Sequence, residues 1–167
     1  MNQPPDLTIR NADPSDDALI ARHFLAMWRD NGVSDDAIHG DGEARARAFV
    51  EDARAQLDYQ AFIAKVVDGS GGGPGHKVVG SAGAQRFDGL YPNVLTAEHR
   101  LYGYVWGVYV EPDWRCRGIA RRLTEAAVDH LRAIGCSRVL LHSSPHGRSV
   151  YEKLGFEPTN EMGRMLR

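Results

Sequence analysis

A cluster of small and basic residues between a strand-like segment and a helix-like segment could bind a pyrophosphate. Residues 115–120 read RCRGIA and follow the apolar run VYVEP. Gly118 and Ala120 leave little side chain in the way. Consecutive backbone N–H groups at the helix start can therefore point at an anion, and the helix dipole adds partial positive charge there. Four arginines in or next to this loop add positive charge: Arg115, Arg117, Arg121 and Arg122.

This loop, of the form R-x-x-G-x-A, resembles the acetyl-CoA-binding motif of the GNAT superfamily of N-acetyltransferases, written Q/R-x-x-G-x-G/A. A second family-like segment, Ser149–Phe156 (SVYEKLGF), follows about one helix and one strand later. Two motifs in this order and spacing are far more specific than a glycine string alone. The resemblance covers residues 102–157 closely and residues 8–100 only through the order of elements. It implies a single N-acetyltransferase domain over residues 1–167.

Hydrophobic periodicity and turn residues predict the elements that must position these motifs. The expected elements of the first half are a strand at 7–10, a helix that carries Ile20 and Trp28 and stops at Gly32, a helix at 43–57, and strands at 60–67 and 76–87. The second half is expected to form a strand at 101–110, a helix at 118–134, a strand at 138–142, a short helix at 147–154 and a last strand or hairpin from Phe156 to near Leu166. The resemblance implies an α/β (α+β) fold. Its sheet is mixed, mostly antiparallel and six- or seven-stranded, is flanked by about four helices, and splays between the fourth and fifth strands.

Glycines mark two special places in this order. Residues 68–75 (DGSGGGPG) join two strands, and Gly75 is followed by His76 rather than by Lys and a hydroxyl residue, so they predict a hairpin tip and not a phosphate loop. Gly107 interrupts the strand at 101–110 and predicts a bulge there. In the resembled family this strand splays and pairs with the pantetheine arm of the cofactor. The alternative is a kinked core strand.

The resemblance also implies roles for individual residues. The backbone N–H of Val108 is the oxyanion contact, and Tyr151 is the general acid that protonates the departing thiolate; packing beside Val150 and Leu154 is the alternative for Tyr151. Ser144 stands where the family commonly has Asn. The implied acetyl-CoA contacts are Val108, Tyr109, Val110, Arg115, Cys116, Arg117, Gly118, Ile119, Ala120, Arg121, Ser144 and Tyr151.

The general base is not assigned by the sequence. A protonated alkylamine must lose a proton before it attacks a thioester. Residues 101–110 contain no Asp, Glu or His. Glu98, His99 and Glu111 are nearby, and a chain of waters could also serve.

Other residues favour structural interpretations. His142 and His146 are four apart but do not share a helix, so we expect ordinary surface or hydrogen-bonding histidines and no metal site. Met27 and Trp28 fit the core-facing stripe of the first helix. Cys116 and Cys136 lie at opposite ends of one predicted helix, so we expect no disulfide between them.

Composition limits the partners. The chain has 167 residues, 43% of them apolar and 25% charged, with a formal net charge of −2. We therefore expect no nucleic acid partner, no membrane partner and a cytoplasmic location, while a homodimer is left open. Residues 30–58 have more Asp and Glu than Arg. That excess suits either a cationic acceptor or a solvated acidic face.

Taken with the resemblance, these features predict an acetyl-CoA-dependent N-acetyltransferase that acts on a primary amine, in a small molecule or a peptide, by direct attack in a ternary complex. Two alternatives remain. One is an acyl-CoA-binding or sensing module without turnover, favoured by the missing carboxylate. The other is acetylation of a protein N-terminus or lysine.

Overall fold

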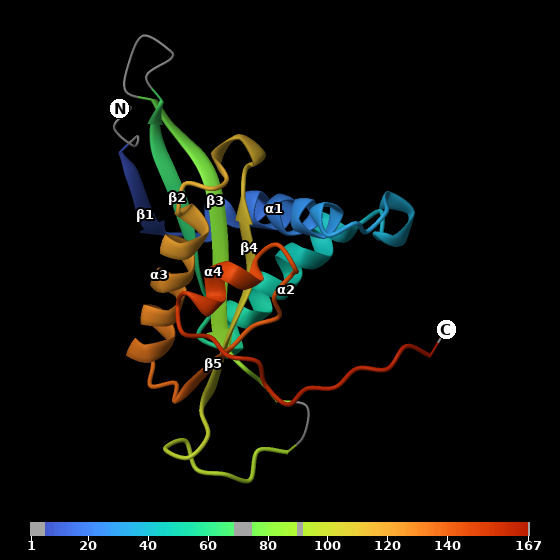
Figure 1. The fold of residues 1–167 in the computed structure, drawn as a ribbon, viewed down its shortest axis with the longest axis vertical. Coiled ribbons are helices and arrows are strands. Elements are labelled where there is room, and N and C mark those ends of the chain that lie inside the picture. The colour runs from blue at the N-terminus through green and yellow to red at the C-terminus, as the bar shows by residue number, and fades with distance from the viewer. Residues whose placement is uncertain (1–5, 69–74, 90–91, 167) are drawn as a thin grey trace.

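A five-stranded mixed sheet forms the centre of the computed structural model, which describes residues 6–68, 75–89 and 92–166 (Figure 1). Its order follows the sequence, β1-β2-β3-β4-β5. The first four strands pair antiparallel with their neighbours, and β5 joins β4 in parallel. The strands are β1 (Leu7–Asn11), β2 (Gln60–Asp68), β3 (Gly75–Arg86), β4 (Tyr102–Val110) and β5 (Arg138–Leu140).

Helices cover both faces of this sheet (Figure 1). The α-helices are α1 (Asp17–Asp30), α2 (Gly42–Gln56), α3 (Ile119–Ala133) and α4 (Arg148–Glu152). Short 3-10 turns precede three of them: η1 (Pro14–Asp16), η2 (Asp35–Ala37) and η3 (Pro112–Trp114). None of the helices in the described ranges has both the length and the apolar character that crossing a membrane requires.

Two hydrophobic clusters, one on each face of the sheet, hold the layers together. Successive side chains of a strand point to opposite faces, so neighbours on β2 belong to different clusters. Phe62 packs in the cluster that contains Leu123 and Leu131 of α3, whereas Ile63 packs with Ile20 of α1 and with α2. The predicted stripe of α3 is confirmed, because its apolar positions are buried in the first cluster.

The sheet opens where β4 leaves β5. β5 pairs with β4 only from Tyr102 to Tyr104, so the rest of β4 has no strand on that side. The register of β4 against β3 also shifts: Ser81 lies opposite Tyr109, but Gly83 lies opposite Trp106. β4 therefore contains one extra residue, and Gly107 adopts φ +62 there. Both the bulge at Gly107 and the splay between the fourth and fifth strands are confirmed.

The predicted elements are present within a few residues of their expected bounds, with two exceptions. The described sheet has five strands rather than six or seven. The expected last strand from Phe156 to near Leu166 is wrong, since no strand forms there and residues 157–166 run away from the sheet (Figure 1). This segment carries Pro158 and Gly163 and lacks the alternation that would bury one face of a strand. The predicted hairpin tip at 69–74 lies outside the described residues.

Candidate active site

The loop at residues 115–121, which we call the anion loop, contains residues in the left-handed backbone conformation just before α3. Gly118 is the N-cap residue of α3 with φ 75 and ψ 6, and Cys116 also has a positive φ of 60. A Cβ placed on Gly118 would meet nothing within 4 Å. Glycine is therefore favoured at this position by its backbone conformation and not by crowding. The start of α3 has no side-chain cap hydrogen bond, so the N–H groups of its first turn are available to a ligand.

The four arginines in or next to the loop differ in their contacts: two bond to distant parts of the chain and two contact only nearby residues. Arg115 is tied into the fold: its Nε donates to the carbonyl of Val110 at 2.9 Å, and its guanidinium pairs with Asp30. Arg122 donates to the carbonyl of Leu7 at 2.9 Å. Arg117 and Arg121 are exposed beside the loop and make local contacts only. Arg117 lies 4.8 Å over the Trp114 ring, and Arg121 pairs with Glu125 at 3.0 Å.

Two of the other motif positions, Ile119 and Ala120, also make contacts within the fold. Cys116 is an exposed free thiol, whereas the side chain of Ile119 is buried against the sheet. The carbonyl of Ala120 accepts from the hydroxyl of Thr124 at 2.8 Å. At these positions the groups left for a ligand are backbone N–H groups of the first turn and the Cys116 thiol.

Beyond the bulge, alternate backbone groups of β4 face the open side of the sheet. Glu111 N–H donates to the carbonyl of Val79 on β3 at 2.9 Å, so the backbone of Glu111 points toward β3. Polar backbone groups alternate along an antiparallel strand, and those of Val110 and Val108 therefore point away from β3. The bond from Arg115 to the Val110 carbonyl agrees with this direction. The ring of Tyr109 is buried and stacks on His23 at 4.8 Å.

A cavity of about 1120 Å³ lies between the helices α1 and α2, the strand β4 and the segment after β5. It brings together three predicted site residues: Val108, Ser144 and Tyr151 all line it. Tyr109, Val110 and the loop 115–121 do not. The Ser144 hydroxyl accepts from the backbone N–H of Gly147 at 3.1 Å.

Tyr151 is half-buried at this cavity. Its ring packs against Phe156 with centroids 6.0 Å apart. Burial raises the pKa of the phenol above its usual value, so the hydroxyl stays protonated at neutral pH. The hydroxyl has no hydrogen-bond partner among the described residues. It can therefore donate to a ligand in the cavity.

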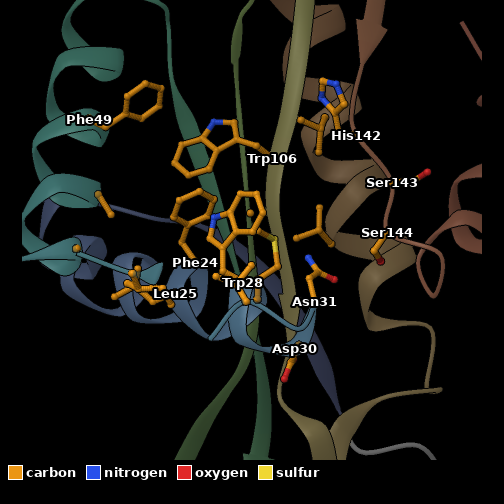
Figure 2. A pocket seen from close by; sticks show the side chains of 18 of the residues that line it. Phe24, Leu25, Trp28, Asp30, Asn31, Phe49, Trp106, His142, Ser143 and Ser144 are labelled. Atoms are coloured by element: carbon orange, nitrogen blue, oxygen red, sulfur yellow. The ribbon is translucent and has the colours of Figure 1, made fainter. Parts of the chain in front are cut away.

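The rest of the cavity is strongly aromatic, which the sequence did not reveal. Figure 2 shows the rings of Phe24, Trp28, Phe49 and Trp106 on one side of the cavity, across from His142 and Ser144. Trp28 is 43% exposed, so its assignment to the core was wrong. Helical spacing places it on the inner face of α1, but there this face lines the cavity and is not part of a core cluster. The available signal was a bulky aromatic at the edge of each apolar stripe, Trp28 on α1 and Phe49 on α2.

The family follows from comparison with known proteins. The model of the acetyltransferase (GNAT) family matches residues 24–156. The chain belongs to this family. The predicted relationship and the predicted enzyme class, an acyltransferase of the GNAT type, are confirmed at the level of the family.

Named relatives of this GNAT chain acetylate different amines. It is 28% identical to the aminoglycoside N(6')-acetyltransferase type 1 of Stenotrophomonas maltophilia over 93% of this chain and 89% of that protein. It is 32% identical to the glucosamine 6-phosphate N-acetyltransferase of Trypanosoma brucei brucei over 55% of this chain, a match that spans only 59% of that enzyme.

Solved GNAT structures share the fold. A GCN5-related N-acetyltransferase from Ralstonia eutropha JMP134 superposes with a TM-score of 0.76 at 22% identity, over 96% of this chain and 98% of that one. A predicted acetyltransferase with acetyl-CoA from Clostridium acetobutylicum gives 0.75 at 23% identity, over 95% of both chains. The predicted fold class is thereby confirmed.

His23 and His142 of this GNAT chain each form a hydrogen-bonded network with groups on β4 or next to it. Buried His23 bonds to the Ser81 hydroxyl at 2.8 Å and lies 3.3 Å from Glu111. Burial lowers the pKa of His23 despite the opposing effect of Glu111. Exposed His142 bonds to the Tyr104 hydroxyl and to Glu161 at 3.0 Å. His142 is thus a hydrogen-bonding surface histidine, as expected.

Neither network identifies the base, and no metal centre is evident. Of the candidates Glu98, His99 and Glu111, none lines the cavity. Within the described ranges, no three His, Cys, Asp or Glu side chains are grouped so that they could hold a metal ion.

The acidic excess at residues 30–58 is partly neutralised by arginines. Among the described residues, four of its aspartates form ion pairs: Asp30 with Arg115, Asp35 with Arg29, Asp41 with Arg45 and Asp58 with Arg86. The other four acidic residues of this segment, Asp36, Glu43, Glu51 and Asp52, form no ion pair with a described residue.

Proposed function

We propose that the chain is an acetyl-CoA-dependent N-acetyltransferase that transfers an acetyl group to a primary amine by direct attack in a ternary complex. One observation carries the proposal: a single cavity extends from Val108 and Tyr151 to a separate aromatic region large enough for a second substrate. Thioester and amine could then occupy it together, with no need for a covalent acetyl-enzyme. The names of the curated relatives, which describe N-acetyltransferases, support an amine acceptor.

The residues present fit acetyl-CoA. The open first turn of α3, with Gly118 at φ 75, would receive the pyrophosphate, and exposed Arg117 and Arg121 would add positive charge. The backbone groups of Val108 and Val110 that face away from β3 would bond to the pantetheine arm. Acetyl-CoA supplies an acetyl group activated as a thioester.

Two groups of this chain would act on the reacting atoms. The N–H of Val108 would donate to the thioester oxygen as negative charge develops there. The hydroxyl of Tyr151 would give its proton to the sulfur as the carbon–sulfur bond breaks and the carbon–nitrogen bond forms. The amine gives up one proton, which restores the phenol through solvent. The raised pKa of Tyr151 keeps its hydroxyl protonated at neutral pH, so the proton is present when the thiolate departs.

Turnover is the direct test. The chain is mixed with acetyl-CoA and a panel of primary amines, and free thiol is followed with time. We expect amine-dependent release of one thiol for each acetylated amine. Saturable acetyl-CoA binding without release with any amine or peptide would support the non-catalytic binding module instead, and turnover of peptides alone would support a protein acetyltransferase.

The remaining features stay predictions. They are the single domain over 1–167, the cytoplasmic location, the lack of a metal, nucleic acid or membrane partner, and the open question of a homodimer. Sedimentation and metal analysis of the purified chain address the assembly and the metal.

A further inference from the structure

The aromatic side of the cavity is an ordered structure. We call the rings of Phe24, Trp28, Phe49 and Trp106 the aromatic wall. Phe24 lies 5.1 Å from Trp106 and 6.1 Å from Trp28, and Phe49 lies 5.4 Å from Trp106, measured between ring centroids. All three pairs meet edge to face, at 80–82°. This is a favoured arrangement for aromatic pairs, so the rings hold each other in place.

Trp106 is the fixed centre of the wall. Its Nε1 donates to the side-chain carbonyl of Gln85 at 2.9 Å. It packs over Gly83, where an added Cβ would lie 3.3 Å from the indole ring. Both contacts come from β3, the neighbouring strand. The indole is therefore positioned before any ligand arrives, which lowers the entropy cost of binding against it.

The two outer rings expose apolar surface. Trp28 is 43% exposed and Phe49 is 51% exposed. Large apolar side chains that gather at a cavity and remain uncovered are typical of a ligand-binding surface. Their exposed area would be buried by a second substrate, at a gain of about 25 cal/mol for each Å² removed from water.

The charges that line the cavity are already paired. Its lining contains one carboxylate, Asp30, and one guanidinium, Arg45, among the described residues. Asp30 pairs with Arg115, and Arg45 pairs with Asp41 at 2.7 Å. A polycationic or phosphorylated acceptor would find few unpaired charges here. The hydroxyls of an amino sugar would lose hydration against the rings of the aromatic wall, which costs free energy wherever no hydrogen-bond partner replaces the lost water.

We infer that the acceptor is a primary amine that carries an aryl or comparably compact apolar group, which packs against the aromatic wall while the amine points toward Val108 and Tyr151. This inference rests on the proposed function and adds its substrate class. It differs from what the names of the relatives describe, an aminoglycoside and a sugar phosphate. The difference lies in the lining of the cavity and not in the fold.

The test compares acceptors and wall variants. We measure kcat/KM for 2-phenylethylamine, ethylamine, glucosamine 6-phosphate and kanamycin at saturating acetyl-CoA. We expect 2-phenylethylamine to be preferred over each of the others by about tenfold or more, the scale on which apolar pockets discriminate. A higher kcat/KM for either sugar substrate would overturn the inference and leave the proposed function standing.

Variants of the aromatic wall test whether it causes the preference for 2-phenylethylamine. Phe49→Ala and Trp28→Ala remove exposed rings, so both should fold; melting temperatures check this. Each should lower kcat/KM for 2-phenylethylamine by about tenfold while that for ethylamine changes little. Leu95→Ala is the control, because Leu95 is also exposed (42%) but does not line the cavity. Equal losses for both amines would refute a specificity role for the wall.

Binding separates failure of the inference from failure of the proposed function. The fluorescence of the tryptophans is titrated with 2-phenylethylamine in the presence of coenzyme A. Saturable quenching that Phe49→Ala weakens supports the wall as the amine site even if no amine is turned over, in which case only the proposed function fails. No saturable quenching together with no preference in turnover would overturn the inference.

Discussion

Replacing Gly118 by Asp and by Asn tests the anion loop with a matched pair. The two side chains have nearly the same size, and both tolerate the left-handed conformation that Gly118 adopts at φ 75. Neither meets a steric clash, since a Cβ there has nothing within 4 Å. Asn and Asp are also similarly good N-cap residues. The two variants therefore differ mainly in one negative charge at the proposed pyrophosphate site.

The expected loss of acetyl-CoA affinity depends on how far Gly118 is exposed to solvent. Two unit charges about 5 Å apart repel by about 1 kcal/mol in water and by about 3 kcal/mol at an effective dielectric constant of 20. Gly118 is exposed, so a value between these limits applies, and the Asp variant should bind acetyl-CoA about tenfold more weakly than the Asn variant. The gap should narrow as salt is raised, because exposed charges are screened.

The assay is the rise in melting temperature on adding acetyl-CoA. A ligand at 100 times its Kd stabilises by about 2.7 kcal/mol, and a tenfold weaker Kd leaves about 1.4 kcal/mol. In a domain of this size each kcal/mol is worth about 2–4 °C. We expect the Asp variant to keep at most about half of the shift that the Asn variant shows. Equal shifts for the two variants at low salt would refute the placement of the pyrophosphate.

Three further changes test other parts of the molecule. Tyr151→Phe should lower kcat by about 10²-fold with acetyl-CoA affinity and melting temperature retained, and a normal kcat at every pH would return Tyr151 to a packing role. The pKa of His23 is lowered from 6.5, so the unfolded chain takes up a proton at a higher pH than the folded chain does. The free energy of unfolding should therefore fall as the pH drops below about 6.5. Urea unfolding of His23→Gln should show a weaker fall with pH, and a fall identical to that of the parent would contradict this expectation. Gly103→Ala would set a Cβ 2.7 Å from buried Leu131, so it should destabilise by about 1–3 kcal/mol in urea, whereas Gly40→Ala, with open space around it, should not.

Sequence patterns correctly predicted the features that have a strong local signal, such as a regular hydrophobic periodicity. The stripe on α3 and the bulge at Gly107 were both predicted, because each depends on a local property of the chain: a helical face to bury, or a residue that accepts a positive φ. The motif R-x-x-G-x-A likewise identified the start of α3. Local patterns were sufficient where the structural cause is itself local.

The aromatic wall could not be predicted in this way. Helical spacing tells which residues share a face, but not how far the sheet extends beneath that face. Phe49 lies on the same stripe as the buried Val50, yet it is 51% exposed. The expected last strand was wrong because the residues after Phe156 have no alternating apolar face to bury. The base remained unassigned because chain neighbours of β4, such as Glu111, do not line the cavity.

The extra residue at Gly107 also changes which residues of β4 face each side of the sheet. Before it, Val105 faces α3 and Trp106 faces α1 and α2; after it, Val110 faces α3 and Tyr109 contacts His23 of α1. Odd-numbered and even-numbered residues thus exchange sides at the bulge. If the chain alternated regularly through Gly107, without the bulge, Tyr109 would turn toward α3, Val110 would turn toward α1, and the backbone of Val108 would point toward β3. The relative orientation of Trp106, the centre of the aromatic wall, and of Val108, the proposed oxyanion donor, therefore depends on the bulge at Gly107.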